Sequence, residues 1–300
     1  MNKSLLLIFV LFGILISPLI FPPNFIYLAE AQQQSITNVS SSKNVTDLLK
    51  SNSKNPSTPL ENRTVNYFGN ASGYLVYPVS SSSVSIKNNT TTANNHTLPA
   101  VVMIHENKGL NENIKKMANL LAKEGYVVLA VDLFNGEVTT DQKRASELSQ
   151  AIRNNPESAI TNLKSAVKYL TSLPNVNPEK IASLGWCFGG QQSLQLALNS
   201  EDHPLAATVI YYGRLVTEPE TLSKIKWPVL GIFGEQDESI PVPTVEQFEE
   251  ALTKNGITNE IYIYKGVGHA FANPSGENYA PNETQGAWHK TISFLNKYLK

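Results

Sequence analysis

Short apolar runs alternate with stretches of helical periodicity from about residue 62 onward, and this alternation limits the possible folds more than any other feature. Each run is apolar at nearly every position, as in strands that are covered on both faces. Between the runs, residues 114–121 and 160–170 show the spacing of amphipathic helices. The apolar runs are residues 100–104, 126–131, 181–184, 207–212, 229–233 and 261–264. Strands that alternate with helices predict an α/β fold with a mostly parallel, doubly wound sheet and helices on both faces.

The segments before and between these runs indicate how the domain is organised. Residues 66–68 and 74–79 read as a hairpin, which predicts an antiparallel start to the sheet. Residues 32–61 are polar, with few apolar residues and no sustained period, and this predicts a disordered linker. Residues 80–97 have a similar composition but lie between two predicted strands, so we expect a surface loop there. One domain over residues 62–300 is therefore expected.

The N-terminus has the features of a secretory signal. A positive charge at Lys3 precedes an apolar run from Leu5 to Ile16, and Ala29-Glu30-Ala31 has the small-x-small form of a signal-peptidase site. We expect residues 1–31 to be a signal peptide and the protein to be exported. The alternative is an uncleaved anchor, because the apolar stretch to Phe21 approaches the ~20 residues that span a bilayer. Contact with a membrane is expected only in that case.

Asn-x-Ser/Thr triplets give separate support for export, because they are acceptors for N-glycosylation. The polar composition of the N-terminal part could also produce such triplets by chance. Their asparagines are Asn38, Asn44, Asn62, Asn70, Asn88, Asn89, Asn95 and Asn282. The formal net charge of −1 gives no reason to expect a nucleic-acid partner. No group of His, Cys, Asp and Glu has metal-ligand spacing, and no glycine-rich phosphate loop occurs, so neither a metal nor a cofactor is expected.

The sharpest local motif is the hexapeptide from Gly185 to Gly190, which contains Cys187, the only cysteine of the chain. It follows a predicted strand and precedes a predicted helix, and so has the Gly-x-nucleophile-x-Gly form of a nucleophile elbow. Such a turn places the thiol at a helix N-terminus, where the helix dipole favours a thiolate. It also points the backbone N–H of Phe188 at the substrate oxygen, as one oxyanion donor. The other interpretation is a buried structural cysteine in a glycine-rich turn.

Candidate partners for the thiol follow in the order that an elbow enzyme requires. Asp237 comes just after the strand at residues 229–233, and His269 comes after the strand at residues 261–264. His269 would take the thiol proton and Asp237 would orient the imidazole. Asp237 could instead be a turn residue or a helix cap, and Glu235 and Glu238 are competing acids.

With these residues in place, the chain resembles the dienelactone hydrolase family over roughly residues 65–300. Four motifs carry the resemblance: residues 105–110 (HENKGL), 185–190 (GWCFGG), 234–237 (GEQD) and 268–271 (GHAF). The resemblance implies the α/β-hydrolase fold, a Cys-His-Asp triad of Cys187, His269 and Asp237, and an ester or lactone substrate. It also implies that Glu106 interacts with the thiol, and that the backbone N–H of Asn107 is the second oxyanion donor.

The sequence departs from the family where the substrate carboxylate is bound. Members that cleave dienelactone use one arginine shortly after the fourth strand and another just beyond the catalytic histidine. Here residues 132–136 read DLFNG and residues 269–273 read HAFAN, and neither contains arginine. Lys108 or Arg214 could substitute. The resemblance thus supports the chemistry more than it supports dienelactone as substrate.

Two other functions are compatible with the sequence. An exported binding protein could retain this fold without catalysis, and in that case Cys187 and His269 would lie too far apart to interact. A thiol redox protein is a weaker alternative, because the chain has no second cysteine to resolve an oxidised one.

Overall fold

A computed structural model describes residues 58–79 and 97–300 of the protein. The predicted signal peptide, nearly all of the predicted linker and residues 80–96 of the predicted loop lie outside these described residues. Within them, no helix is both long enough and apolar enough to cross a membrane.

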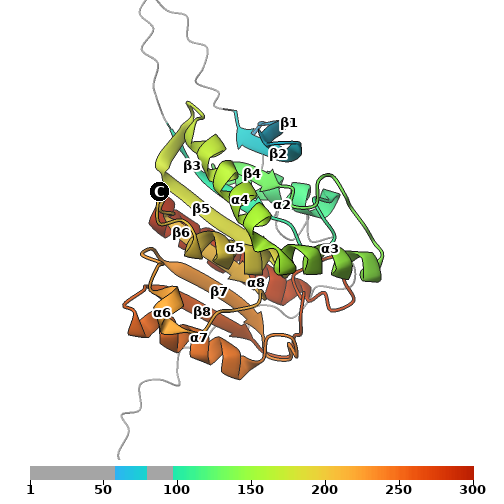
Figure 1. The fold of residues 1–300 in the computed structure, drawn as a ribbon, viewed down its shortest axis with the longest axis vertical. Coiled ribbons are helices and arrows are strands. Elements are labelled where there is room, and N and C mark those ends of the chain that lie inside the picture. The colour runs from blue at the N-terminus through green and yellow to red at the C-terminus, as the bar shows by residue number, and fades with distance from the viewer. Residues whose placement is uncertain (1–57, 80–96) are drawn as a thin grey trace, which may run out of the picture. The chain divides into compact units, whose positions relative to one another are not determined.

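An eight-stranded sheet forms the centre of the fold, in the order β1-β2-β4-β3-β5-β6-β7-β8 (Figure 1). The strands from β3 to β8 are parallel, while β2 runs antiparallel to both β1 and β4. The strands are β1 (Leu60–Phe68), β2 (Ala71–Pro78), β3 (Leu98–Ile104), β4 (Val127–Val131), β5 (Val176–Trp186), β6 (Ala207–Tyr211), β7 (Val229–Gly234) and β8 (Asn259–Tyr264). The predicted α/β fold, with its antiparallel start, is confirmed.

Helices cover both faces of this sheet. The described helices are α2 (Glu112–Lys123), α3 (Gln142–Asn154), α4 (Pro156–Thr171), α5 (Phe188–Leu198), α6 (Pro219–Leu222), α7 (Val242–Lys254) and α8 (Pro281–Leu299). Successive residues of a strand point to opposite faces, so β3 contributes to two apolar cores. Val101 and Met103 pack with residues of α2 and α8, whereas Val102 and Ile104 pack with residues of α4, α5 and α7. This double covering explains why the parallel strands are apolar without interruption.

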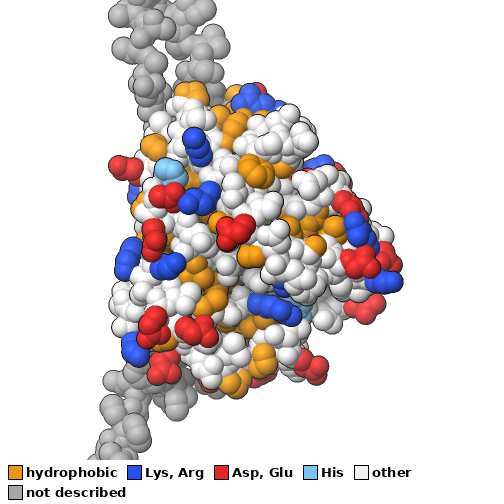
Figure 2. Space-filling view, viewed as in Figure 1, with side chains coloured by type: hydrophobic (Ala, Val, Ile, Leu, Met, Phe, Trp, Pro, Cys, Tyr) orange, Lys and Arg blue, Asp and Glu red, His pale blue; other side chains and the backbone are white. Residues whose placement is uncertain are grey.

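The first strand, predicted over residues 66–68 only, begins at Leu60; its first part escaped prediction because most of its side chains are exposed and its sequence is polar. Of the asparagines in predicted glycosylation triplets, Asn62 in β1, Asn70 in the turn after it and Asn282 in α8 lie among the described residues, and all three are exposed. On the face shown in Figure 2, acidic and basic side chains are interspersed.

The parallel strands bring the predicted site residues to one edge of the sheet, because their carboxyl ends all point the same way. Glu106 follows β3, Cys187 follows β5, Asp237 follows β7 and His269 follows β8. Tyr212 follows β6 at the same edge. The fold therefore assembles a site from residues that are far apart in the sequence.

Candidate active site

Cys187 lies in a strained turn between β5 and α5. Its backbone has φ 54° and ψ −116°, in the region that residues with side chains rarely adopt. A Cβ atom on Gly185 would collide with the carbonyl of Gly189, and one on Gly189 would collide with the carbonyl oxygens of Ile104 and His105. The glycines of the motif are thus required for close approach of backbone to backbone, as the elbow predicts. The turn holds the thiol at the N-terminus of α5.

Cys187, His269 and Asp237 form a continuous chain of contacts. Nε2 of His269 lies 3.1 Å from Sγ of Cys187, and Nδ1 of the same ring lies 2.8 Å from Oδ2 of Asp237. The other carboxylate oxygen, Oδ1, accepts hydrogen bonds from the backbone N–H groups of Ser239 and Ile240 at 2.8 and 3.1 Å. Asp237 is therefore both a turn residue and the partner of His269. A binding protein with separated Cys187 and His269 would not have this arrangement.

The surroundings of His269 favour its protonated form. Burial lowers the pKa of this imidazole, but hydrogen bonds to Asp237 and Cys187, together with their negative charges, raise it from 6.5 to about 10. The site therefore favours an imidazolium beside the sulfur. Of the competing acids, Glu235 accepts a hydrogen bond from the backbone N–H of Gly266 at 3.0 Å, and Glu238 is exposed. Neither takes the place of Asp237.

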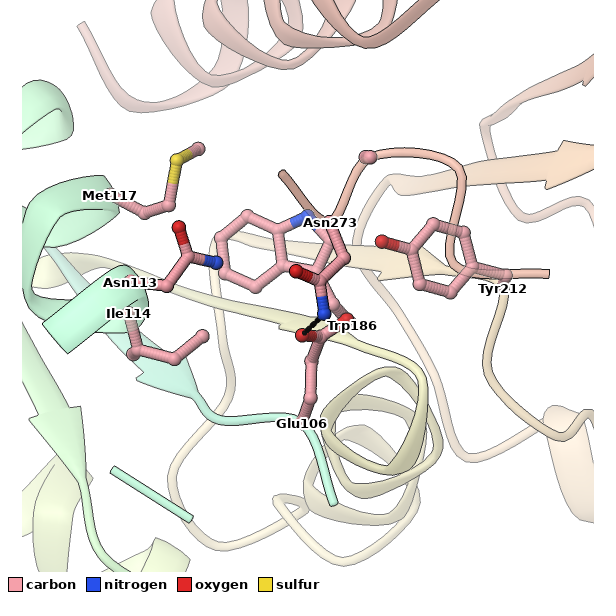
Figure 3. A pocket seen from close by; sticks show the side chains of 8 residues that line it. Glu106, Asn113, Ile114, Met117, Trp186, Tyr212 and Asn273 are labelled. Atoms are coloured by element: carbon pink, nitrogen blue, oxygen red, sulfur yellow. Dashed lines mark hydrogen bonds between the residues drawn. The ribbon is translucent and has the colours of Figure 1, made fainter. Parts of the chain in front are cut away.

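Glu106 is a buried carboxyl group beside the triad. Its Oε2 accepts a hydrogen bond from Nδ2 of Asn273 at 2.6 Å (Figure 3). Burial raises the pKa of Glu106 to about 7, against the opposing positive charges of His269 and Lys108. The family resemblance implies an interaction between Glu106 and the thiol, whereas in this structure the carboxyl group pairs with the amide of Asn273.

The two predicted oxyanion donors lie on neighbouring segments. Phe188 is the first residue of α5, where backbone N–H groups have no partner within the helix. Asn107 follows Glu106 in a turn that is closed by a hydrogen bond from the N–H of Gly109 to the carbonyl of Glu106, 3.3 Å long. The close approach of Gly189 to the end of β3 brings these segments together. Their role as donors stays a prediction.

His105 supports the loops beside the site. Its Nε2 accepts a hydrogen bond from the backbone N–H of Leu133 at 3.1 Å, so Nδ1 carries the proton and donates it to the carbonyl of Glu106 at 2.6 Å. The ring thereby links the ends of β3 and β4. His203 and His289 are exposed, and His96 lies outside the described residues.

Sequence reasoning missed three residues around the site. Asn273 is the hydrogen-bond partner of Glu106. The only sequence feature that could have identified it is its position four residues after His269. Tyr212, at φ 35°, sets its ring edge toward His269 with 5.3 Å between centroids. Its buried hydroxyl lies near the backbone of Ala272 without an aligned hydrogen bond. Arg153 extends from α3 toward the ring of Phe188, 5.9 Å from its centroid.

The Glu106–Asn273 pair lines a small cavity. Asn113, Ile114 and Met117 of α2 line one side of it, and Tyr212 lies on the other (Figure 3). Its volume of about 10 Å³ is close to the space that one water molecule needs. Among residues 58–79 and 97–300, no group of three or more His, Cys, Asp or Glu side chains could hold a metal ion.

Comparison with known proteins places this site in a family. Residues 87–299 match the model of the dienelactone hydrolase family. A Saccharolobus solfataricus protein that is named provisionally as a carboxymethylenebutenolidase is 30% identical over 235 residues, which cover 67% of this chain and 90% of that protein. Protein usf of Aquifex pyrophilus is 31% identical over 206 residues, which cover 67% of this chain and 89% of that protein.

A solved structure shares the fold. The dienelactone hydrolase-like promiscuous phosphotriesterase P91, from metagenomic libraries, superimposes with a TM-score of 0.69 at 22% identity, over 80% of this chain and 99% of P91. The family match covers more than half of the chain, and the folds agree. The chain therefore belongs to the dienelactone hydrolase family and is a hydrolase of the carboxylic ester type with the α/β-hydrolase fold.

Proposed function

We propose that this protein hydrolyses small esters or lactones with Cys187 as the nucleophile, through a thioester intermediate. The observation that carries the proposal is the unbroken chain from Sγ of Cys187 through the ring of His269 to the buried carboxylate of Asp237, with contacts of 3.1 and 2.8 Å. Each group lies within reach of the next for proton transfer and orientation.

Acylation follows from this geometry. With the thiol proton on Nε2 of His269, the thiolate attacks the carbonyl carbon of the substrate to form a tetrahedral intermediate. The backbone N–H groups of Phe188 and Asn107 would stabilise its oxyanion. The bond between carbon and the leaving oxygen then breaks, and His269 gives its proton to that oxygen. A thioester on Cys187 and a free alcohol, or the opened lactone, result.

Deacylation uses the same groups in the opposite order. Water attacks the thioester while His269 accepts one of its protons, and the carbon–sulfur bond breaks as that proton returns to sulfur. Asp237 keeps the imidazole in the tautomer that both steps require. Its fixed position, held by the N–H groups of Ser239 and Ile240, suits this role.

Kinetics of a single substitution test the nucleophile. Cys187→Ala should abolish turnover of p-nitrophenyl acetate, because no other cysteine exists to replace the thiol. His203→Ala, at an exposed histidine outside the site, is the matched control and should retain wild-type turnover. Undiminished turnover by the Cys187→Ala protein would rule the proposal out.

We also propose that the enzyme acts outside the cytoplasm. The charged start, the apolar run and the small-x-small sequence ending at Ala31 support an N-terminal export signal. A lone cysteine suits such a compartment, because it can form no internal disulfide that would remove the nucleophile.

A further inference from the structure

Arg153 links helix α3 to the turn that holds the nucleophile. It lies in the last turn of α3, and its Nε donates a hydrogen bond to Oε1 of Gln191 at 3.0 Å. Its guanidinium carbon lies 5.9 Å from the centroid of the Phe188 ring. Phe188 and Gln191 both belong to the first turn of α5, which begins directly after Cys187. The two contacts therefore fix a positive charge beside the residues that follow the thiol.

The placement of Arg153 on α3 directs it toward the body of the protein. This helix buries only Ala145 and Ser149. Arg153 follows them at a spacing of four residues, so its side chain leaves the helix on the same side. Arg153 is half-buried and forms no ion pair with any residue that the structure describes, whereas Arg144 on the same helix pairs with two glutamates.

A cation beside the first turn of α5 opposes the field of that helix. The N-terminus of a helix carries partial positive charge, so a guanidinium there is destabilised unless an anion lies close by. Burial lowers the pKa of Arg153, the positive charge of Arg214 lowers it further, and negative charge on Cys187 raises it. The thiolate of Cys187 is thus an anion that favours a charged arginine at this place.

Other titratable groups face the thiol from the ends of the strands. Nε2 of His269, which is paired with Asp237, lies 3.1 Å from Sγ and favours the thiolate when the ring is protonated. An ionised Glu106 would disfavour it. Burial raises the pKa of Tyr212, and the negative charges of Glu106 and the cysteine raise it further, so its phenol stays neutral. An arginine, by contrast, stays positive throughout the pH range in which a cysteine ionises.

We propose that Arg153 is a positioning residue of the active site, which holds a permanent positive charge beside the turn of Cys187 and so stabilises the thiolate. The inference rests on the proposed function, in which this thiolate is the nucleophile. Nearby cations lower the pH at which a cysteine ionises and thereby make it reactive under milder conditions. In this role Arg153 does not touch the substrate, and it acts equally on neutral and charged substrates.

A purely structural role for Arg153 would be to dock α3 onto α5 through Gln191. Two substitutions separate that role from the electrostatic one. Arg153→Lys keeps the positive charge but loses the planar guanidinium that bonds Gln191 and lies over the Phe188 ring. Arg153→Gln keeps a polar group that can form a hydrogen bond, but it has no charge. The electrostatic role predicts that Arg153→Lys resembles the wild type and that Arg153→Gln does not.

Alkylation by iodoacetamide reports directly on the thiolate. The reagent is neutral, the thiolate displaces its iodide, and Cys187 is the only cysteine of the chain. Rates are measured by the mass of the intact protein between about pH 4 and pH 9, a range that includes the ionisation of cysteine. Where the rate rises with pH, Arg153→Gln should react about three- to tenfold more slowly than the wild type, because a nearby unit charge has been removed. Arg144→Gln is the control on the same helix and should react as the wild type does.

Ester hydrolysis gives a second readout of the same effect. The acidic limb of the pH dependence of kcat/KM reports ionisation in the free enzyme. With p-nitrophenyl acetate, this limb should lie at higher pH for Arg153→Gln than for the wild type or Arg153→Lys. Thermal unfolding checks that each variant is folded.

Two results would overturn the proposal. One is an Arg153→Gln alkylation profile that superimposes on that of the wild type. The other is an equal loss in Arg153→Lys, which would leave Arg153 as a residue that only docks α3. If the wild-type protein turns over no ester, the proposed esterase fails, and the alkylation profiles still decide the role of Arg153 by themselves.

Discussion

At the scale of single residues, the least ordinary group is the carboxyl of Glu106. It is 5% exposed, and it meets the amide of Asn273 instead of a cationic partner. Burial penalises its charged form, and this accounts for a pKa of about 7. Near neutral pH the group can therefore hold or release a proton a short distance from the triad.

This raised pKa predicts how stability depends on pH. The folded state binds the proton of Glu106 more tightly than the unfolded chain, where the pKa is near 4.5. The stability that the proton confers is complete below pH 4.5 and is lost as the pH rises through 7, by up to about 3 kcal/mol. Glutamine at this position has no proton to release. The free energy of unfolding of Glu106→Gln should therefore rise relative to that of the wild type between pH 4.5 and pH 8.

Urea denaturation of the wild type and of Glu106→Gln at pH 4.5 and at pH 8 measures this change in relative stability. Glu238→Gln, at an exposed glutamate, should show no such change with pH. A difference between Glu106→Gln and wild type that is the same at both pH values would contradict a raised pKa at Glu106.

At the scale of elements, the β5–α5 turn depends on glycine for a reason that can be tested. In Gly189→Ala the added Cβ would meet the carbonyl oxygens of Ile104 and His105 at the end of β3, which cannot move without displacing Glu106. We expect a loss of at least about 2 kcal/mol in the free energy of unfolding, as for other overpacked sites.

Gly286→Ala is the matched control within α8. Its Cβ would find its nearest neighbour, the Tyr264 ring, at 3.6 Å, an ordinary contact. Alanine should therefore keep or raise stability there, by up to about 1 kcal/mol, because it is the better helix former. Thermal unfolding of both variants compares the two sites, and equal effects would argue against a steric requirement at the elbow.

The elements that could be predicted from the sequence are those whose burial produces a regular pattern of apolar residues. The parallel strands are buried on both faces and appear as unbroken apolar runs, so their positions and their parallel direction could be predicted. Strand β1 is mostly exposed, and its polar sequence hid its first residues. Helix α3 buries only Ala145 and Ser149, so no clear period marked it, and Arg153 on it was missed.

At the scale of the whole molecule, the site joins residues that only the folded chain brings together. The positions of Cys187, His269 and Asp237 could be predicted, because each follows a strand and parallel strands end at a common edge. The pairing of Glu106 with Asn273 could not, because it joins residues 167 positions apart and depends on how two loops pack. The same holds for the approach of Arg153 to Phe188 and Gln191.

The export proposal also concerns the whole chain. When the full sequence is expressed in a host that secretes proteins, the mature form should begin at Gln32, because the small-x-small site ends at Ala31. Mass measurement of the N-terminal peptide of the secreted protein checks this. A product that retains Met1 to Ala31 in the membrane fraction would favour the uncleaved anchor instead.

The central claim, that Cys187 carries the acyl group, can be tested directly by trapping the intermediate. The enzyme is mixed with p-nitrophenyl acetate, quenched in acid within the first turnovers, digested and analysed by peptide mass. An acetyl group is expected on the peptide that contains Cys187; hydroxylamine should remove it, as it removes a thioester, and it should be absent from the Cys187→Ala protein. Steady ester turnover with an acetyl group on another residue, or with none on Cys187, would contradict the claim.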